Sequence, residues 1–282
     1  MEILNFHQMS WQEGWKQFEK PCVKVDISSL VSKTDKMIEQ ADSREKVIEL
    51  INICEEIIKI DPTNQKALIE LYSFCFLVGY GYADNKEEKK EYFVKTIKYS
   101  EQYMYSNPEF KLLADKGDKV WEACRVLSVR EMEAMSYWYM SVGLYWKECQ
   151  GVGGKLINIK WPIRIKKVLV SMMEIDPTWL NGVPYYLWAN YYANAPGIVG
   201  GDLKKAEEYY KKAIELGPNM LNYRRSRSYY VYTKKKDRES FKRDLEWVIS
   251  QDPHKAGLSY PWNAFIQHDA KNGLANINNY FR

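Results

Sequence analysis

The sequence is short of the residues that metal and redox proteins need. Its 282 residues include three histidines and five cysteines, and no two cysteines stand in a C-x-x-C pair. Structural zinc sites and thioredoxin-type centres require such close pairs, so we predict neither a metal site nor a cofactor. The widely spaced cysteines are instead predicted to be small, buried apolar residues. They are Cys22, Cys54, Cys75, Cys124 and Cys149.

Long apolar runs and a strong charge imbalance are also missing. No stretch approaches the roughly 18 uncharged apolar residues of a membrane-spanning helix. A formal net charge of +4 is too small for the concentrated basic face of a nucleic-acid-binding protein. Residues 1–11 lack the features of a signal peptide, and Cys22 lacks a lipoprotein context. We therefore expect a cytoplasmic chain as numbered, with a periplasmic location as the alternative if a leader was removed.

The motifs of common enzymes do not occur. The sequence has no G-x-S-x-G elbow, no H-E-x-x-H and no cysteine–histidine signature. Glu131 and Glu133 are two residues apart, a spacing that points side chains away from each other on a helix. The loop from Gly197 to Asp202 has neither the Lys-Ser/Thr of a P-loop nor a preceding strand, so its glycines are expected to shape the loop. We predict that the protein is not an enzyme.

Aromatic residues and helical periodicity are abundant. Aromatics make up 15 % of the chain, with 10 Trp and 22 Tyr, which excludes a disordered protein. Apolar residues between Val47 and Ile58 follow the spacing of a helix with one buried stripe. Strand signals are nearly absent. Besides the helix around residues 41–60, we expect helices near 64–80, 87–106, 110–125, 129–149, 160–175, 182–194, 220–233, 238–250 and 260–280.

Prolines divide these helices repeatedly. An Asp, Asn or Gly followed by proline closes a predicted helix at Pro62, Pro108, Pro177, Pro218 and Pro253. The intervals between these prolines are 46, 69, 41 and 35 residues, and the interval of 69 corresponds to about two repeats with one closing proline missing. Helices that recur at spacings near 34 residues are typical of tetratricopeptide helix pairs. We predict an all-α fold of tetratricopeptide-like helical hairpins. Residues 1–40 are expected to form a weakly structured arm with a short helix from Trp11 to Phe18, and residues 41–282 a single repeat domain.

Two glycine-rich stretches have different expected roles. After Gly200 and Gly201, Asp202 stands where the N-cap of a helix should be. The predicted packing stripe of that helix consists of Ala206, Tyr209, Tyr210, Ala213, Ile214 and Leu216. The stretch 151–154 is expected to form a flexible corner between two helices.

The C-terminal half resembles the T-component proteins associated with TRAP transporters. The likeness rests on the run from Ala189 to Ala213, which contains Tyr-Tyr-Ala, a proline loop, Gly-Gly-Asp and a repeat helix. An upstream Trp-containing helix at 135–146 and a downstream aromatic helix at 229–241 follow the same order. The resemblance covers residues 128–282. It implies an α-helical repeat protein that assists the substrate-binding proteins of TRAP-type uptake systems, typically in the cell envelope.

Two aromatic faces are candidate ligand-binding surfaces. In the first group the second and third members lie seven and eight residues after the first, and in the second group successive members lie three and four residues apart, so each group shares one side of a helix. Rings with polar tips could line a pocket with apolar walls, or they could be ordinary packing between repeats. The candidates are Trp138, Tyr145 and Trp146 in one group and Tyr185, Trp188 and Tyr192 in the other.

A third candidate is a basic helix. Arg224 and Arg227 are three residues apart and could clamp a carboxylate, and Tyr230 follows on the same helix. Because TRAP-type systems generally carry organic anions, the resemblance favours the same ligand. A solvated face with local ion pairs is the alternative.

Three functions remain open from the sequence. The chain could bind a small organic ligand, or a partner carrying one, in an aromatic-lined cavity. It could be an adaptor that holds a peptide in a concave groove. It could also be an assembly factor or accessory subunit of a cytoplasmic complex. A protein partner is expected in each case: a TRAP-type substrate-binding protein in the envelope, or otherwise a cytoplasmic complex. Exposed aromatic faces also predict a homo-oligomer.

Overall fold

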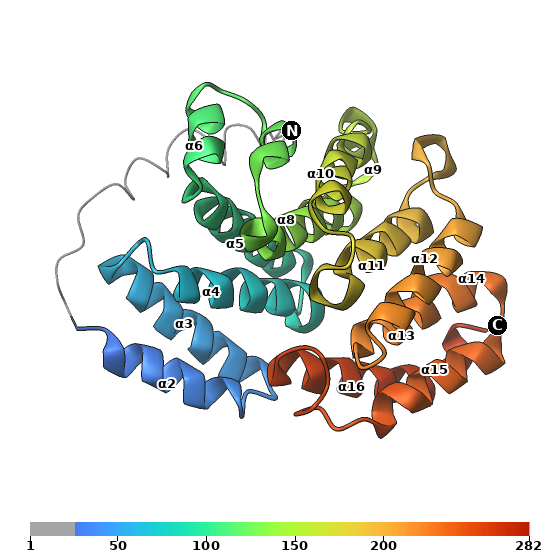
Figure 1. Cartoon of the computed structure of the whole chain (residues 1–282). Coiled ribbons are helices and arrows are strands. Elements are labelled where there is room, and N and C mark those ends of the chain that lie inside the picture. The colour runs from blue at the N-terminus through green and yellow to red at the C-terminus, as the bar shows by residue number, and fades with distance from the viewer. Residues whose placement is uncertain (1–25, 282) are drawn as a thin grey trace. The chain divides into compact units, whose positions relative to one another are not determined.

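The computed structural model describes residues 26–281 and is all-α, which confirms the predicted fold class; it contains no strand within that range. The described residues pack as two compact units, drawn in Figure 1. One comprises residues 26–37 and 44–175, and the other comprises residues 38–43 and 176–281.

The first unit is built from neighbouring helices that pack pairwise. Helix α3 packs on α4, α4 on α5, and α5 on α8, which also contacts α10. In chain order the elements are α2 (Ser28–Ile38), α3 (Arg44–Ile60), α4 (Gln65–Leu77), η2 (Val78–Tyr82), α5 (Lys86–Tyr105), α6 (Pro108–Asp115), α7 (Val120–Ala123), η3 (Cys124–Val126), η4 (Val129–Glu131), α8 (Met132–Leu144), η5 (Tyr145–Cys149), α9 (Val152–Ile157) and α10 (Trp161–Ile175).

The second unit has the same kind of packing. Helix α11 packs on α12, α12 on α13, and α13 on both α15 and α16. Its elements are α11 (Trp179–Asn194), η6 (Gly197–Val199), α12 (Leu203–Leu216), α13 (Leu221–Arg227), η7 (Ser228–Tyr232), α14 (Thr233–Lys235), α15 (Arg238–Ser250), α16 (Tyr260–Ala275) and η8 (Ile277–Asn279). The tetratricopeptide-like repeat arrangement, and the predicted domain limits of 1–40 and 41–282, remain predictions.

Prolines end the helices as the sequence predicts. Helices α3, α5, α10, α12 and α15 stop one or two residues before the pairs that contain the five closing prolines. The prolines restrict the residue before them to extended conformations, so the helix cannot continue. The pair Asn107-Pro108 also starts the next helix, α6. The side chain of Asn107 caps that helix by accepting hydrogen bonds from the backbone N–H groups of Glu109 and Phe110.

The N-cap predicted at Asp202 is confirmed. Its carboxylate accepts the backbone N–H groups of Lys204 at 3.0 Å and Lys205 at 3.1 Å. These donors have no partner inside the helix, so the cap satisfies two groups that would otherwise need water. Within α12, Ala206 and Tyr210 are fully buried, as the predicted packing stripe requires.

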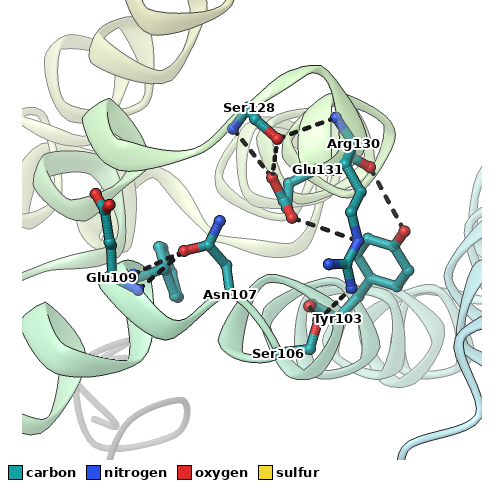
Figure 2. Close-up of polar contacts among 8 residues, drawn as sticks. Tyr103, Ser106, Asn107, Glu109, Ser128, Arg130 and Glu131 are labelled. Carbon is teal, nitrogen blue, oxygen red and sulfur yellow. Dashed lines mark hydrogen bonds and ion pairs between the residues drawn. The ribbon is translucent and has the colours of Figure 1, made fainter.

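A polar cluster fixes the start of the Trp-containing helix α8, as Figure 2 shows. The backbone N–H and hydroxyl of Ser128 both donate to one oxygen of Glu131, at 3.0 and 2.8 Å. The backbone N–H of Arg130 donates to Ser128 Oγ, and its guanidinium donates to Ser106 Oγ at 3.2 Å. Glu131 is therefore a buried capping residue, and it does not form an acid pair with Glu133.

Three local expectations were wrong. Residues 28–38 of the predicted arm form the helix α2, while the helix predicted at 11–18 lies outside the described residues. The predicted corner at 151–154 instead begins the short helix α9 at Val152. The single helix expected over 110–125 is split into α6 and α7 around Gly117, whose φ of +91° is in the left-handed region.

Three helices end in π-helical segments that the sequence does not predict. These segments are η2, η5 and η7, which follow α4, α8 and α13. Such wider turns are rare and occur often at functional sites. Two of them carry candidate residues from the sequence: Tyr145 and Trp146 lie in η5, and Tyr230 lies in η7.

Candidate functional site

An aromatic cluster joins helices α11 and α12 in the second unit. Tyr185, Trp188 and Tyr192 share one face of α11, as predicted, and all three meet the ring of Tyr209 on α12. The distances between ring centroids are 5.8 Å from Tyr185, 6.4 Å from Trp188 and 5.2 Å from Tyr192. Trp188 also lies 5.4 Å from Tyr192. We call these four residues the α11–α12 cluster.

The α11–α12 cluster reaches the surface of its unit. Trp188 is buried, whereas Tyr185, Tyr192 and Tyr209 are each partly exposed. Burial is the main cause of the raised pKa of Tyr192, with a hydrogen bond to Tyr209 contributing. The ammonium group of Lys205 lies 5.6 Å from the centroid of the Tyr192 ring. The cluster therefore offers apolar ring faces, phenol hydroxyls and one nearby cation.

The glycine-rich loop after α11 is tied to this helix. The hydroxyl of Tyr191 donates to the carbonyl of Val199, and the backbone N–H of Asp202 donates to the carbonyl of Tyr192 at 2.9 Å. Gly200 has a φ of +102°, as expected of a glycine that shapes a loop. A Cβ on Gly201 would overlap the carbonyl of Ala195. The loop thus has one defined path beside the cluster.

A second set of rings supports the cluster from the interior. Tyr186 stacks on Tyr223 at a centroid distance of 4.9 Å and meets the fully buried Tyr210 at 6.3 Å. The Tyr186 hydroxyl hydrogen-bonds with Ser226 at 3.2 Å. Tyr186 and Tyr210 adjoin the cluster residues Tyr185 and Tyr209 in the chain, so these contacts fix how α11 and α12 present the cluster.

The two predicted arginines hold a carboxylate, and it is the chain's own Asp244. Arg227 donates to it through Nε at 2.8 Å and Nη2 at 2.9 Å, and Arg224 donates through Nη1 at 3.3 Å. Asp244 is completely buried. In the structure these two arginines form local ion pairs, which is the alternative given for them in the sequence analysis. Their role in binding an external anion remains a prediction.

The rest of the basic helix is also engaged. The Arg224 guanidinium lies 4.4 Å from the Trp247 ring, and Arg225 pairs with Asp269 at 2.9 Å. Three guanidinium groups face two carboxylates in this network, which leaves one surplus positive charge. Tyr230, on the following π-helical segment, is partly exposed.

The other predicted aromatic group lies in the first unit. Trp138 and Tyr145 are buried, with 2 % and 1 % of their surface exposed. The indole N–H of Trp138 donates to the fully buried carboxylate of Glu101 at 2.6 Å. This bond joins α8 to α5, so Trp138 and Tyr145 are packed interior residues of the unit, and ligand contact by either one stays a prediction.

Trp146 is more exposed than the other two members of this group, Trp138 and Tyr145. It is partly exposed, yet its indole nitrogen is buried and has no hydrogen-bond acceptor among residues 26–281. A buried donor without an acceptor is costly, and each such group calls for an explanation. Trp146 is thus the member of this group with an unused polar end.

Two carboxyl groups of the first unit have pKa values raised towards neutral pH. Burial raises the pKa of Glu70 to about 7, with the charge of Glu133 adding to the shift, and burial raises the pKa of Glu133 to about 7. One turn farther along the same helices, Ser73 of α4 and Tyr137 of α8 are joined by a 2.9 Å hydrogen bond. The sequence gives no sign of this acidic pair, because its members are 63 residues apart.

The described part of the chain has two further properties. It contains no group of three or more His, Cys, Asp or Glu side chains that could hold a metal ion. None of its helices is both long and apolar enough to cross a membrane. Four of the cysteines are free and buried, as predicted, and Cys22 lies outside the described residues: the four are Cys54, Cys75, Cys124 and Cys149.

Comparison with known proteins identifies one family. The family model described as TRAP transporter T-component matches residues 85–281, which is well over half of the chain. The match begins earlier than the predicted resemblance, which started at residue 128, and it includes the α11–α12 cluster and the arginine network. None of the curated proteins compared with the chain matches it.

Proposed function

The chain belongs to the TRAP transporter T-component family, and we propose that it is a non-catalytic component that binds a small organic ligand at the α11–α12 cluster. One observation carries the proposal. Tyr185, Trp188 and Tyr192 all meet the ring of Tyr209 in the matched segment, and the three tyrosines are partly exposed. Ligand sites combine such apolar ring faces with a few polar groups that fix orientation.

The charge beside the cluster favours an organic anion. Lys205 and Tyr209 are four residues apart on α12, so they lie on the same side of that helix. The Lys205 ammonium is close to the Tyr192 ring and could receive a carboxylate while the rings contact the apolar body of the ligand. Arg224 and Arg227 are not among the proposed ligand contacts, because both already bind the carboxylate of Asp244.

Calorimetric titration with a panel of linear and aromatic monocarboxylates tests this proposal. We expect Tyr192→Ala and Tyr209→Ala to weaken binding at least about tenfold, since each removes a ring from the contact surface. Tyr260→Ala is the matched control, because Tyr260 is a partly exposed ring that stacks on His254 outside the cluster. Unchanged affinity in both cluster variants, or no binding by any member of the panel, contradicts the proposal.

Membership of the family implies a transporter partner, and we propose that this partner is a TRAP-type substrate-binding protein. The two proteins would have to meet in the cell envelope, so this proposal replaces the cytoplasmic expectation with the periplasmic alternative. Cell fractionation followed by affinity capture of the tagged chain tests both points. Recovery of the chain with cytoplasmic proteins and without a binding protein would support the alternative of an accessory subunit.

A further inference from the structure

Exposed aliphatic side chains concentrate in one short segment of the first unit. Eleven large hydrophobic residues are exposed among residues 26–281, and six of them lie within residues 152–170. Val152 is 78 % exposed and Leu156 is 68 % exposed. We call this segment the 152–170 patch, and its exposed aliphatic members are Val152, Leu156, Ile157, Ile159, Ile163 and Val170.

The patch is also uniformly basic. No Asp or Glu occurs between Glu148 and Glu174, so the segment carries only positive side chains. These are Lys155, Lys160, Arg164, Lys166 and Lys167. Within the described part of the chain, neither Lys155 nor Lys160 forms an ion pair, whereas Lys167 pairs with Glu122 at 2.5 Å.

The packing of α9 and α10 leaves this patch uncovered. Helix α10 buries one side, which includes Trp161, Ile165 and Leu169. Helix α9 has no buried residue at all, although half of its six residues are Val, Leu or Ile. Ile163 and Val170 are seven residues apart, which places them together on α10, away from its buried side. Figure 1 labels both helices.

A short turn joins α9 to α10. Its backbone hydrogen bonds run from the N–H of Ile159 to the carbonyl of Leu156 at 3.4 Å and from the N–H of Trp161 to the carbonyl of Asn158 at 3.0 Å. Leu156 on α9, Ile159 in the turn and Ile163 on α10 are all exposed, so exposed aliphatic side chains continue through the connection. Lys155 and Lys160 lie beside them in the sequence.

We infer that the 152–170 patch docks on an anionic lipid surface. Helices that lie in the membrane interface combine an apolar face with Lys and Arg on the polar side, and their binding increases with apolar area and with anionic lipid. The charges of the segment suit such a surface, because residues 149–173 contain no carboxylate that lipid phosphates would repel, and the adjacent carboxylate of Glu122 is paired with Lys167. This peripheral contact goes beyond the binding proposed at the α11–α12 cluster, which is in the other unit.

The chemistry of the patch favours lipid over a protein partner. The hot spots that dominate binding at protein interfaces are enriched in Trp, Tyr and Arg. The exposed hydrophobic members of this patch are all aliphatic, while Trp161 is buried and Arg164 lies over the rings of Trp121 and Trp161, at 5.2 and 5.3 Å. Aliphatic chains flanked by flexible lysines suit the boundary between acyl chains and headgroups.

Vesicle flotation of the full chain tests the inference. Phosphatidylcholine vesicles with and without phosphatidylglycerol are compared at low and at high salt. We expect binding to the vesicles that contain phosphatidylglycerol, with a partition that falls as salt screens the charges. Lys155→Gln with Lys160→Gln should lower this partition by roughly 30-fold, because two lysines near the surface are lost.

Matched variants separate docking by the 152–170 patch from the general effect of removing exposed hydrophobic residues or lysines. Leu156→Ser with Ile163→Ser should lower the partition at least about tenfold, since apolar area leaves the interface. Ile198→Ser with Leu112→Ser, and Lys116→Gln with Lys211→Gln, remove exposed side chains of the same types elsewhere and should leave it unchanged. No binding to either vesicle, or equal binding by all four double variants, overturns the inference. Light scattering that shows an oligomer abolished by Leu156→Ser also overturns it, because a second copy would then cover the patch.

Discussion

Arg227 holds the carboxylate of Asp244 with two guanidinium nitrogens, in a position where Asp244 has no exposure to solvent. The pair joins α13 to α15, and Arg224 adds a third hydrogen bond to the same carboxylate. A buried carboxylate is tolerated only when its charge is paired and its lone pairs are satisfied. The arginines that the sequence marks as anion ligands are thus part of what holds the second unit together.

Breaking this network should be costly. We expect Asp244→Asn to lower the free energy of unfolding by about 3–5 kcal/mol, because two mostly buried guanidinium groups lose their counter-charge. Glu246→Gln is the control on the same helix: it removes an exposed pair with Lys242 and should cost less than about 1 kcal/mol. Urea unfolding of both variants checks the prediction, and equal stabilities would contradict it.

Alanine substitutions at two glycines of the glycine-rich loop should differ in their effect on stability. We expect Gly201→Ala to destabilise the protein by about 1–3 kcal/mol, because the new Cβ overlaps the carbonyl of Ala195 and the backbone has to shift. Gly197→Ala has nothing within 4 Å of its Cβ and should change stability by less than about 0.5 kcal/mol. Thermal melts of the two variants measure the difference. A Gly201→Ala variant as stable as Gly197→Ala would mean that the loop path is not fixed.

Glu70 and Glu133 should make stability depend on pH. Both pKa values are raised from 4.5 to about 7 in the folded state, so the folded protein binds more protons than the unfolded chain between these values. As far as these two groups contribute, the free energy of unfolding should therefore be highest below about pH 4.5, fall as pH rises from there to about 7, and level off above it.

Amide variants isolate this contribution. Glu70→Gln and Glu133→Gln remove the buried charge, so each should raise stability at pH 8 by about 1–3 kcal/mol relative to the parent and flatten the decline between pH 4.5 and 7. Denaturant unfolding at a series of pH values measures both effects. A double variant that keeps the parent's pH profile would rule out these two groups as its source.

The bond between Trp138 and Glu101 should also contribute to stability. Trp138→Phe removes the donor to a fully buried carboxylate and leaves a void, so we expect a loss of about 2–4 kcal/mol. Glu101→Gln keeps an acceptor oxygen of the same shape and should cost less. If the glutamine variant is the less stable of the two, the charge of Glu101 matters more than its hydrogen bond with the indole.

Most of the helices could be predicted because local chemistry determines their ends. The residue before each closing proline cannot stay helical, and Asp202 caps its helix through its own side chain. Helix α2 was missed, although Leu30, Val31, Met37 and Ile38 recur within it at helical spacing. Helix α9 was missed because glycines, which disfavour a helix, fill two of its six positions.

The sequence predicted which candidate residues share a face of one helix, but it did not predict which residues of different helices meet. The spacing of Tyr185, Trp188 and Tyr192 correctly placed them on one face of α11. Their common neighbour Tyr209 comes from α12, and sequence spacing marked it only as part of that helix's packing stripe. Asp244 was missed in the same way, because it is separated from Arg227 by 17 residues and a turn.

Hydrogen exchange with and without the tightest-binding carboxylate is the decisive measurement for ligand binding at the α11–α12 cluster, because it locates the ligand without any substitution. We expect slower exchange in peptides that cover residues 185–192 and 203–209, where the four rings of the α11–α12 cluster and Lys205 lie. Slower exchange confined to the first unit, with α11 and α12 unchanged, would contradict it.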